Sequence, residues 1–257
     1  MNNGILKKIE YRLINYYFKR GQMSYSQAGE DMILNCIFLS KSKGVYVDVG
    51  ANHPTKASNT YYFYKKGWTG INIDASPDAI QLFNKHRNKD INIAAGISDI
   101  EDNLNFYIFQ ESSYNTFNAD LIDEIKKASH LIDVKNILVK PLHCFLNQHG
   151  ITEIDFMSID VEGMDLRVLN SNDWSKYRPK VILVEEFNHG NSIINSPIYD
   201  FMQTKGYVYF CQTVTNAFYI ENEFYNQRFV TNDSICRVTA ALGSAESIGN
   251  VKEKSIT

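Results

Sequence analysis

Residues 45–52, with the sequence VYVDVGAN, combine a short β-strand pattern with a tight turn. Valine at alternate positions, with a tyrosine between them, favours an extended conformation. Gly50 lets the backbone turn sharply directly after the strand. Asp48 and Asn52 place a carboxylate and an amide beside that turn. Because ligands of open α/β sheets bind beyond the carboxyl ends of the strands, this segment predicts a strand and one wall of a ligand site.

On both sides of this segment, strand patterns alternate with helical patterns. Helices are expected at 27–39, at 59–66 and at 77–87, where Pro77 stands in the first turn. Strands are expected at 70–74, 91–95, 104–109, 155–159 and 180–184, and the adjacent strands 207–213 and 217–221 have no helix between them. This order predicts an α/β fold with a doubly wound, mostly parallel sheet that ends in an antiparallel strand pair.

The composition is that of a globular protein. The 257 residues are 44% hydrophobic and 21% charged, and 26 basic against 29 acidic residues give a net charge of −3. These values exclude collagen-like, disordered and disulfide-scaffold classes and disfavour a general nucleic-acid binder. The four cysteines lack the spacing of zinc or redox sites. No segment resembles a membrane span or a signal peptide, so a cytoplasmic location is expected.

The two end segments fall outside the α/β pattern. Residues 4–20 have the pattern of a basic amphipathic N-terminal helix, which could rest on the inner face of a membrane. We expect it instead to pack on its own domain or on a second copy of the chain in a homodimer. Residues 240–257 lack aromatic residues and periodicity, which predicts a loose tail. The expected division is a helix at 1–23, one domain at 24–239 and a tail at 240–257.

An acidic residue also ends the second predicted strand. Asp74 stands 24 residues beyond Gly50, where a carboxylate can accept hydrogen bonds from both ribose hydroxyls of an adenosine. The alternative is that Asp74 only begins the cap of the next helix. The turn at Gly50 is not a GxGxxG motif, because Asn52 and His53 stand where a dinucleotide fold needs small residues. NAD and FAD are therefore disfavoured.

Two further strands end in carboxylates. Asp160 and Glu162 are two residues apart on an extended segment, so their side chains point the same way. They could hold a metal, a hydroxyl or an amine, or they could only decorate a helix N-terminus. Glu185 ends the next strand, and His189 in the following loop could act as a general base. Divalent cations prefer oxygen ligands, so Asp160 and Glu185 are also candidate ligands for Mg²⁺ or Mn²⁺.

Together these segments resemble FkbM-type methyltransferases. The matching motifs are, in chain order, SQAGED (26–31), YVDVGAN (46–52), NID (72–74), SIDVEG (158–163) and VE (184–185). The resemblance covers roughly residues 24–221 and implies a Rossmann-like, S-adenosylmethionine-dependent O-methyltransferase, a class that frequently acts on sugars of surface glycans. One departure is His53-Pro54, where such proteins often have an acidic residue and a glycine. Proline fixes φ and removes an N–H, which changes how the amino-acid end of the cofactor can be held.

The resemblance also implies roles for individual residues. The cofactor's methionine part would lie against Asp48, Gly50, Ala51 and Asn52, its ribose against Asp74, and its adenine near Ser98 and Asp99. The residues that would close the site are Gln27, Glu30 and Asp31 on the N-terminal side, with Asn115 and Thr116.

Three functions are consistent with this pattern. The first is methylation of a sugar hydroxyl in a surface glycan or related glycoconjugate, with Asp160 and Glu185 as base or metal ligands and Glu162 and His189 behind them. The second is a nucleotide-sugar or NAD-dependent enzyme on the same fold, although the glycine fingerprint is missing. The third is a non-catalytic subunit that binds an adenosine ligand. The loops 110–135 and 187–197 are expected to shape the acceptor pocket.

Overall fold

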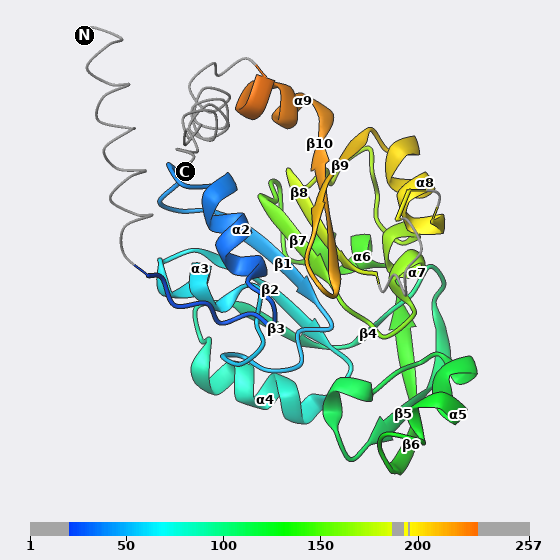
Figure 1. Ribbon diagram of the computed structural model, residues 1–257. Coiled ribbons are helices and arrows are strands. Elements are labelled where there is room, and N and C mark those ends of the chain that lie inside the picture. Colours follow the sequence, from blue (N-terminus) through cyan, green and yellow to red (C-terminus); the bar gives the residue numbers. More distant parts are fainter. Residues whose placement is uncertain (1–20, 187–192, 195, 231–257) are drawn as a thin grey trace, which may run out of the picture. The chain divides into compact units, whose positions relative to one another are not determined.

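The computed structural model describes residues 21–186, 193–194 and 196–230 (Figure 1). Within it, Met23–Glu221 form one compact unit, and α9 (Asn222–Tyr225) and the π-helical turn η3 (Asn226–Val230) lie outside that unit. The helix predicted at 4–20 and the tail predicted at 240–257 lie outside the described residues, so the expected domain division stays a prediction. In the described part of the chain, no helix is both long and apolar enough to span a bilayer.

The main sheet has seven strands in the order β3-β2-β1-β7-β8-β10-β9. Strands β1, β2, β3, β7 and β8 are parallel, and β10 runs antiparallel to both β8 and β9. The strands are β1 (Val45–Val49), β2 (Thr69–Asp74), β3 (Ile91–Ala94), β7 (Phe156–Ile159), β8 (Val181–Glu185), β9 (Tyr207–Gln212) and β10 (Asn216–Glu221). The predicted Rossmann-like, mostly parallel sheet with its C-terminal antiparallel pair is confirmed.

The strand order reverses between β1 and β7. From β1 the chain builds outward to β2 and β3 on one side, and from β7 to β8 and the strand pair on the other. Such a reversal leaves a crevice at the carboxyl ends of the two central strands, which is where open α/β sheets bind ligands. The residues that follow Val49 and Ile159 therefore stand at the place where a site is expected.

Helices cover the sheet and explain the composition of its strands. Strands buried on both faces are nearly continuous apolar runs, as in β7 and β8, whose residues are almost all buried. α4 packs against β2 and β3, and α8 packs against β9 (Figure 1). Both helices begin with Ser-Pro, in which the serine hydroxyl accepts a backbone N–H and proline occupies the first turn. The helices are α2 (Glu30–Ile37), α3 (Tyr61–Lys65), α4 (Pro77–His86), α6 (Leu142–Gln148), α7 (Asp165–Asn170) and α8 (Pro197–Thr204).

A second sheet of three strands, in the order β4-β6-β5, was not expected. It contains β4 (Gly96–Ile97), β5 (Asp102–Phe109) and β6 (Leu131–Lys140), and the strands β5 and β6 form a ribbon beside α5 (Ile122–Ile125), as Figure 1 shows. The sequence predicted β5, but residues 110–135 were expected to be a loop, and β6 begins within them. Ile132 and Val134 of β6 are 65% and 43% exposed. Most residues of β6 are exposed or half-buried, and pairing with β5, rather than burial of one face, holds this strand in place.

Candidate functional site

A cavity of about 580 Å³ lies at the carboxyl ends of β1, β2, β7 and β8. Its polar wall comes from the ends of these strands, and its apolar wall includes side chains of α4 and of the β5–β6 region. The polar residues include Asp48, Asn52, Asp74, Ser158, Asp160, Glu162 and Glu185, and the apolar ones include Leu82, Ile97, Phe106, Phe109 and Phe117. The fold thus brings together strand-end carboxylates that are far apart in sequence, as predicted from their places after the strands.

The turn after β1 is tied to β2 by backbone hydrogen bonds. Gly50 adopts φ +80°, and the amides of Gly50 and Ala51 both donate to the Ile73 carbonyl, at 2.9 and 3.2 Å. Asn52 also has a positive φ of 49° and donates its backbone N–H to Asp74 Oδ2 at 2.8 Å. Glycine and asparagine are the residues that adopt these conformations at least cost. The turn is consequently held in one shape against the cavity.

His53 and Pro54 shape the loop that follows this turn. His53 Nδ1 accepts hydrogen bonds from the backbone N–H groups of Thr55 and Lys56, both at 3.1 Å. Burial lowers the pKa of His53, and the nearby Lys56 lowers it further, so the ring is neutral at pH 7 and free to accept these bonds. The loop then leads to Ala57, Ser58 and Asn59, which line the cavity. His53-Pro54, which departs from the pattern of the family, therefore stabilises a local turn in this chain.

Asp74 supports two backbone turns at the end of β2. Its Oδ1 accepts from Ser76 N at 2.7 Å, in addition to the bond from Asn52 to Oδ2. Burial raises the pKa of Asp74, while both N–H groups oppose that rise. A carboxylate has about four acceptor positions, so two remain for a ligand. Ser76 caps α4, and Asp74 accepts the backbone N–H of this cap residue, so Asp74 has a structural part at the start of the helix as well as a place in the cavity lining.

Asp48 is a buried residue that lines the cavity. Its Oδ2 accepts a hydrogen bond of 2.7 Å from the Thr60 hydroxyl. Burial raises the pKa of Asp48 to about 6, and the hydrogen bond from Thr60 and the charge of Arg87 act in the opposite direction. Thr60 therefore holds one oxygen of Asp48 and favours the ionised form against the effect of burial.

Three carboxyl groups meet where the loop after β7 faces the end of β8. Oxygens of Asp160, Glu162 and Glu185 lie within 4.8 Å of one another. Burial raises the pKa of Glu162 to about 8, and the neighbouring Asp160 adds to the rise. Burial also raises the pKa of Asp160, with the charges of Asp74 and Glu30 adding to the rise and a hydrogen bond from Glu185 opposing it. Burial and the charge of Asp160 raise the pKa of Glu185. Without a cation, this cluster retains protons at neutral pH.

Asp165, which the sequence analysis missed, holds the loop that carries two of these carboxylates. Its oxygens accept from the backbone N–H groups of Val161 and Gly163, each at 3.2 Å. The loop needs this support because Glu162 and Gly163 have φ values of +50° and +87°. Thr116, predicted to close the site, instead donates from its buried hydroxyl to the Glu162 carbonyl at 2.8 Å. An acidic residue in the first turn of the following helix was the available signal for Asp165.

On the N-terminal side, the predicted residues lie in different places. Gln27 lines the cavity. Glu30 is fully buried outside the cavity lining and accepts from the Thr213 hydroxyl at 2.6 Å and from Ala28 N at 2.9 Å. Asp31, also buried, accepts from Ser24, Tyr25 and Ser26. The geometry therefore does not support direct contact of Glu30 or Asp31 with the cofactor. Both carboxylates accept hydrogen bonds that hold the segment that carries Gln27.

The residues expected near the adenine are also displaced. Ser98 is fully buried outside the cavity lining, and Asp99 pairs with Arg167 at 2.7 Å outside it. The cavity is lined instead by Ala95, Gly96 and Ile97, where the chain passes from β3 into β4. Asn115 does line the cavity, and His189 lies outside the described residues.

The strand order, the glycine turn after β1 and the acidic residue at the end of β2 define an α/β protein built to hold a nucleoside ligand at its topological switch point. The Methyltransferase FkbM domain matches residues 48–243, and the chain belongs to this family. It is an S-adenosylmethionine-dependent methyltransferase. The family assignment confirms the resemblance found in the sequence and decides against the NAD-dependent and non-catalytic alternatives.

Comparisons with individual proteins add little to this assignment. No curated protein matches the chain in sequence. Among solved structures, a TehB-like SAM-dependent methyltransferase from Corynebacterium glutamicum aligns over 85% of this chain and 100% of its own, with 10% identity and a TM-score of 0.41. The METTL16 MTase domain aligns over 75% of this chain and 66% of its own, with 11% identity and a TM-score of 0.44. At such scores the assignment rests on the family match.

Proposed function

We propose that this methyltransferase acts on a hydroxyl group of a sugar in a surface glycan or a related glycoconjugate. The observation that carries the proposal is the charge of the cavity. Among the described residues that line it there is no lysine or arginine, whereas the acidic ones are Asp48, Asp74, Asp78, Asp160, Glu162 and Glu185. Recognition of a phosphate backbone depends on basic side chains, so a nucleic acid is a poor acceptor for this cavity.

The rim of the cavity fits a neutral, polyhydroxylated molecule. Four uncharged residues, Ser112 to Asn115, line it at η1 (Ser112–Tyr114) and directly after it. Hydroxyl and amide groups can both donate and accept hydrogen bonds, as sugar hydroxyls do. Like-charge repulsion from those carboxylates of the cavity that are ionised, and the absence of lysine and arginine among its described lining residues, would disfavour an anionic acceptor.

The proposed placement of S-adenosylmethionine follows the ends of the strands. Asp48 would accept from the ammonium group of the methionine part, beside the backbone of Gly50 to Asn52. Asp74 would accept from the ribose hydroxyls through its two remaining acceptor positions. Ala95 to Ile97 would flank the adenine, together with the apolar wall of the cavity. The cofactor supplies an electrophilic methyl group bonded to a sulfonium sulfur.

The chain's own contribution to transfer is orientation and removal of a proton. A sugar hydroxyl is a weak nucleophile until its proton begins to leave, so a base must stand beside it. Burial and neighbouring charges raise the pKa of Glu185 more than that of Asp160, so Glu185 would keep its proton and the Asp160 carboxylate would accept the proton of the acceptor hydroxyl. Holding both reactants in line supplies much of the remaining acceleration.

A divalent cation is a second way in which the same cluster could act. The oxygens of Asp160 and Glu185, with Glu162 close by, form a donor set of the kind that Mg²⁺ and Mn²⁺ bind. When bound there, such a cation would lower the pKa of a coordinated hydroxyl. His189 remains a candidate base from the sequence alone.

The test is transfer of a labelled methyl group from S-adenosylmethionine to three acceptor pools: extracted surface glycan, total RNA and total protein. We expect label in the glycan, loss of label with Asp160→Asn, and wild-type labelling with Asp99→Asn, which changes a carboxylate outside the cavity. Label in RNA or protein but not in glycan would overturn the proposed acceptor. Parallel reactions with a chelator, and then with Mg²⁺ or Mn²⁺ restored, test the cation.

A further inference from the structure

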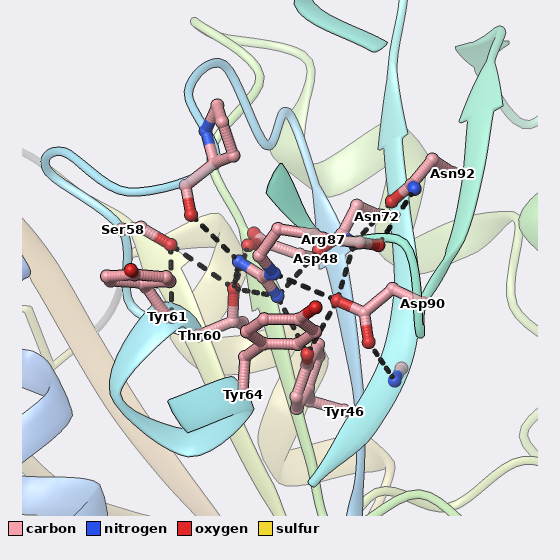
Figure 2. Close-up of polar contacts among 12 residues, drawn as sticks. Tyr46, Asp48, Ser58, Thr60, Tyr61, Tyr64, Asn72, Arg87, Asp90 and Asn92 are labelled. Atoms are coloured by element: carbon pink, nitrogen blue, oxygen red, sulfur yellow. Dashed lines mark hydrogen bonds and ion pairs between the residues drawn. The ribbon is translucent and has the colours of Figure 1, made fainter. Parts of the chain in front are cut away.

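Arg87, directly after α4, is completely buried and does not itself line the cavity. A guanidinium group has five N–H donors and no acceptor, so burial is tolerated only when acceptors surround it. Figure 2 shows this arrangement. The acceptors are Asp90 Oδ2 (2.9 Å), the Tyr46 hydroxyl (2.7 Å), Asn72 Oδ1 (3.2 Å), the Pro54 carbonyl (3.3 Å) and the Thr60 hydroxyl, which both Nη atoms approach to 3.1 Å.

Two of these acceptors are hydroxyl groups, and each also donates a hydrogen bond to a carboxylate. The Tyr46 hydroxyl donates to Asp90 Oδ2 at 2.7 Å, and the Thr60 hydroxyl donates to Asp48 Oδ2 at 2.7 Å (Figure 2). A hydroxyl has a single proton. Because Arg87 can only donate, both hydroxyl oxygens must accept hydrogen bonds from the guanidinium group. Each hydroxyl proton is then left to point toward its carboxylate, Asp90 or Asp48.

The two carboxylates at the ends of this arrangement differ in their surroundings. Asp90 is closed off, since its oxygens also accept from Gly70 N and Asn72 Nδ2, each at 3.0 Å, and its side chain is fully buried. Asp48 lines the cavity, and within the described part of the chain its Oδ1 accepts no hydrogen bond. The Thr60 branch of the network therefore ends at the ligand site, and the Tyr46 branch ends in the core.

We infer that Thr60, oriented by Arg87, is a positioning residue of the cofactor site: it holds Asp48 Oδ2 and leaves Oδ1 as the acceptor for the ammonium group of the methionine part. This inference rests on the proposed role of Asp48. Arg87 also holds the Pro54 carbonyl, so the same guanidinium anchors the start of the loop that lines the cavity at Ala57 to Asn59. The site is thereby assembled before the cofactor binds, which reduces the ordering cost of binding.

The structure offers a matched set of variants. Thr60→Val keeps the shape and removes the hydroxyl, Thr60→Ser restores it, and Tyr46→Phe removes the equivalent hydroxyl from the branch that ends in the core. Calorimetry with S-adenosylmethionine and thermal melting are measured for each. We expect Thr60→Val to bind at least about tenfold more weakly, as the loss of a hydrogen bond to a charged group predicts, and Thr60→Ser to bind within about threefold of wild type. Tyr46→Phe should melt at a lower temperature and bind normally.

A double-mutant cycle with Asp48→Asn shows whether Thr60 acts through Asp48. If it does, Thr60→Val should weaken binding little further in the Asp48→Asn background. Equal affinity of wild type and Thr60→Val, or equal weakening by Thr60→Val and Tyr46→Phe, would overturn the inference. Unchanged affinity of Asp48→Asn would instead show that the proposed role of Asp48 is wrong. A wild-type protein that does not bind S-adenosylmethionine would contradict the proposed function itself.

Discussion

The backbone carbonyl of Asp160 occupies the space in which a side chain at Gly50 would begin. An ideal Cβ at Gly50 would stand 1.7 Å from that oxygen, and Asp160 N in turn donates to the Val49 carbonyl at 3.0 Å. The turn after β1 and the loop after β7 are therefore in direct backbone contact at the switch point. This contact fixes the distance between the cofactor side of the site and its acidic cluster.

Replacement of Gly50 by alanine should disrupt both parts of the site. Gly67→Ala is the matched control, because Gly67 has a similar φ of +89° but open space around its Cβ position. The control should lose only the conformational cost of about 1–2 kcal/mol. Gly50→Ala should lose clearly more, because backbone must move, and should fail to bind S-adenosylmethionine. Urea unfolding and calorimetry measure both effects, and equal losses in the two variants would contradict the steric argument.

Asp74→Asn should weaken cofactor binding at least about tenfold, because it replaces a charged acceptor of the ribose hydroxyls with an amide. The change also places an NH₂ group against one of the backbone N–H groups of Asn52 and Ser76, so a modest loss of stability should accompany it. Asp99→Asn is the control outside the cavity and should bind normally. If calorimetry found weakened binding for Asp99→Asn and normal binding for Asp74→Asn, the result would support the sequence-based placement of the cofactor at Asp99.

Asp160→Asn should bind S-adenosylmethionine nearly as well as wild type and lose about 10²–10⁴ in the rate of methyl transfer. That range is typical of a positioned acid–base group, and the variant keeps the size of the side chain while removing its charge. Single-turnover transfer at saturating cofactor measures the rate, and calorimetry measures the affinity. Lost affinity with an unchanged rate at saturation would place Asp160 in the cofactor site instead.

Stability should fall as pH rises from about 5 to 8 in the absence of divalent cations. Burial raises the pKa of Glu162 to about 8 and that of Asp165 to about 7, so the folded state keeps protons in this range that the unfolded state has lost. Carboxyl groups whose pKa is lowered, such as Asp155, titrate below the range. Each unit of pKa elevation corresponds to about 1.4 kcal/mol.

Glu185→Gln removes one member of the cluster and should reduce this fall in stability. With one carboxyl group fewer, less repulsion builds up as the pH rises, so the variant should melt above wild type at pH 8. Glu153→Gln is the control, because this exposed glutamate precedes β7 whereas the cluster follows it, and it should leave the pH profile unchanged. Melting temperatures that rise with pH in the wild type would show that the cluster is ionised as a whole in the folded state.

Much of the main sheet could be predicted because the patterns that mark its strands, helix starts and turns lie within short stretches of sequence. Continuous apolar runs mark β7 and β8, Ser-Pro marks the starts of α4 and α8, and glycine after β1 marks the turn. The parallel order then places the residues after each strand on one edge of the sheet. For this reason Asp48, Asp74, Asp160 and Glu185, which were selected as strand-end residues, do line one cavity.

Contacts across large sequence separations were decided only by the tertiary structure. Thr116 supports Glu162 across 46 residues and Arg87 reaches Thr60 across 27, and no local pattern marks either pair. Ser98 and Asp99 follow β4, a strand of two residues that the sequence did not predict, and both lie outside the cavity lining. Strand β6 escaped prediction because it is held by pairing rather than by a buried face. The spacing of apolar residues and the residues that form turns can be recognised from neighbouring positions in the sequence. The partner of a buried polar group depends instead on which strands the fold places side by side.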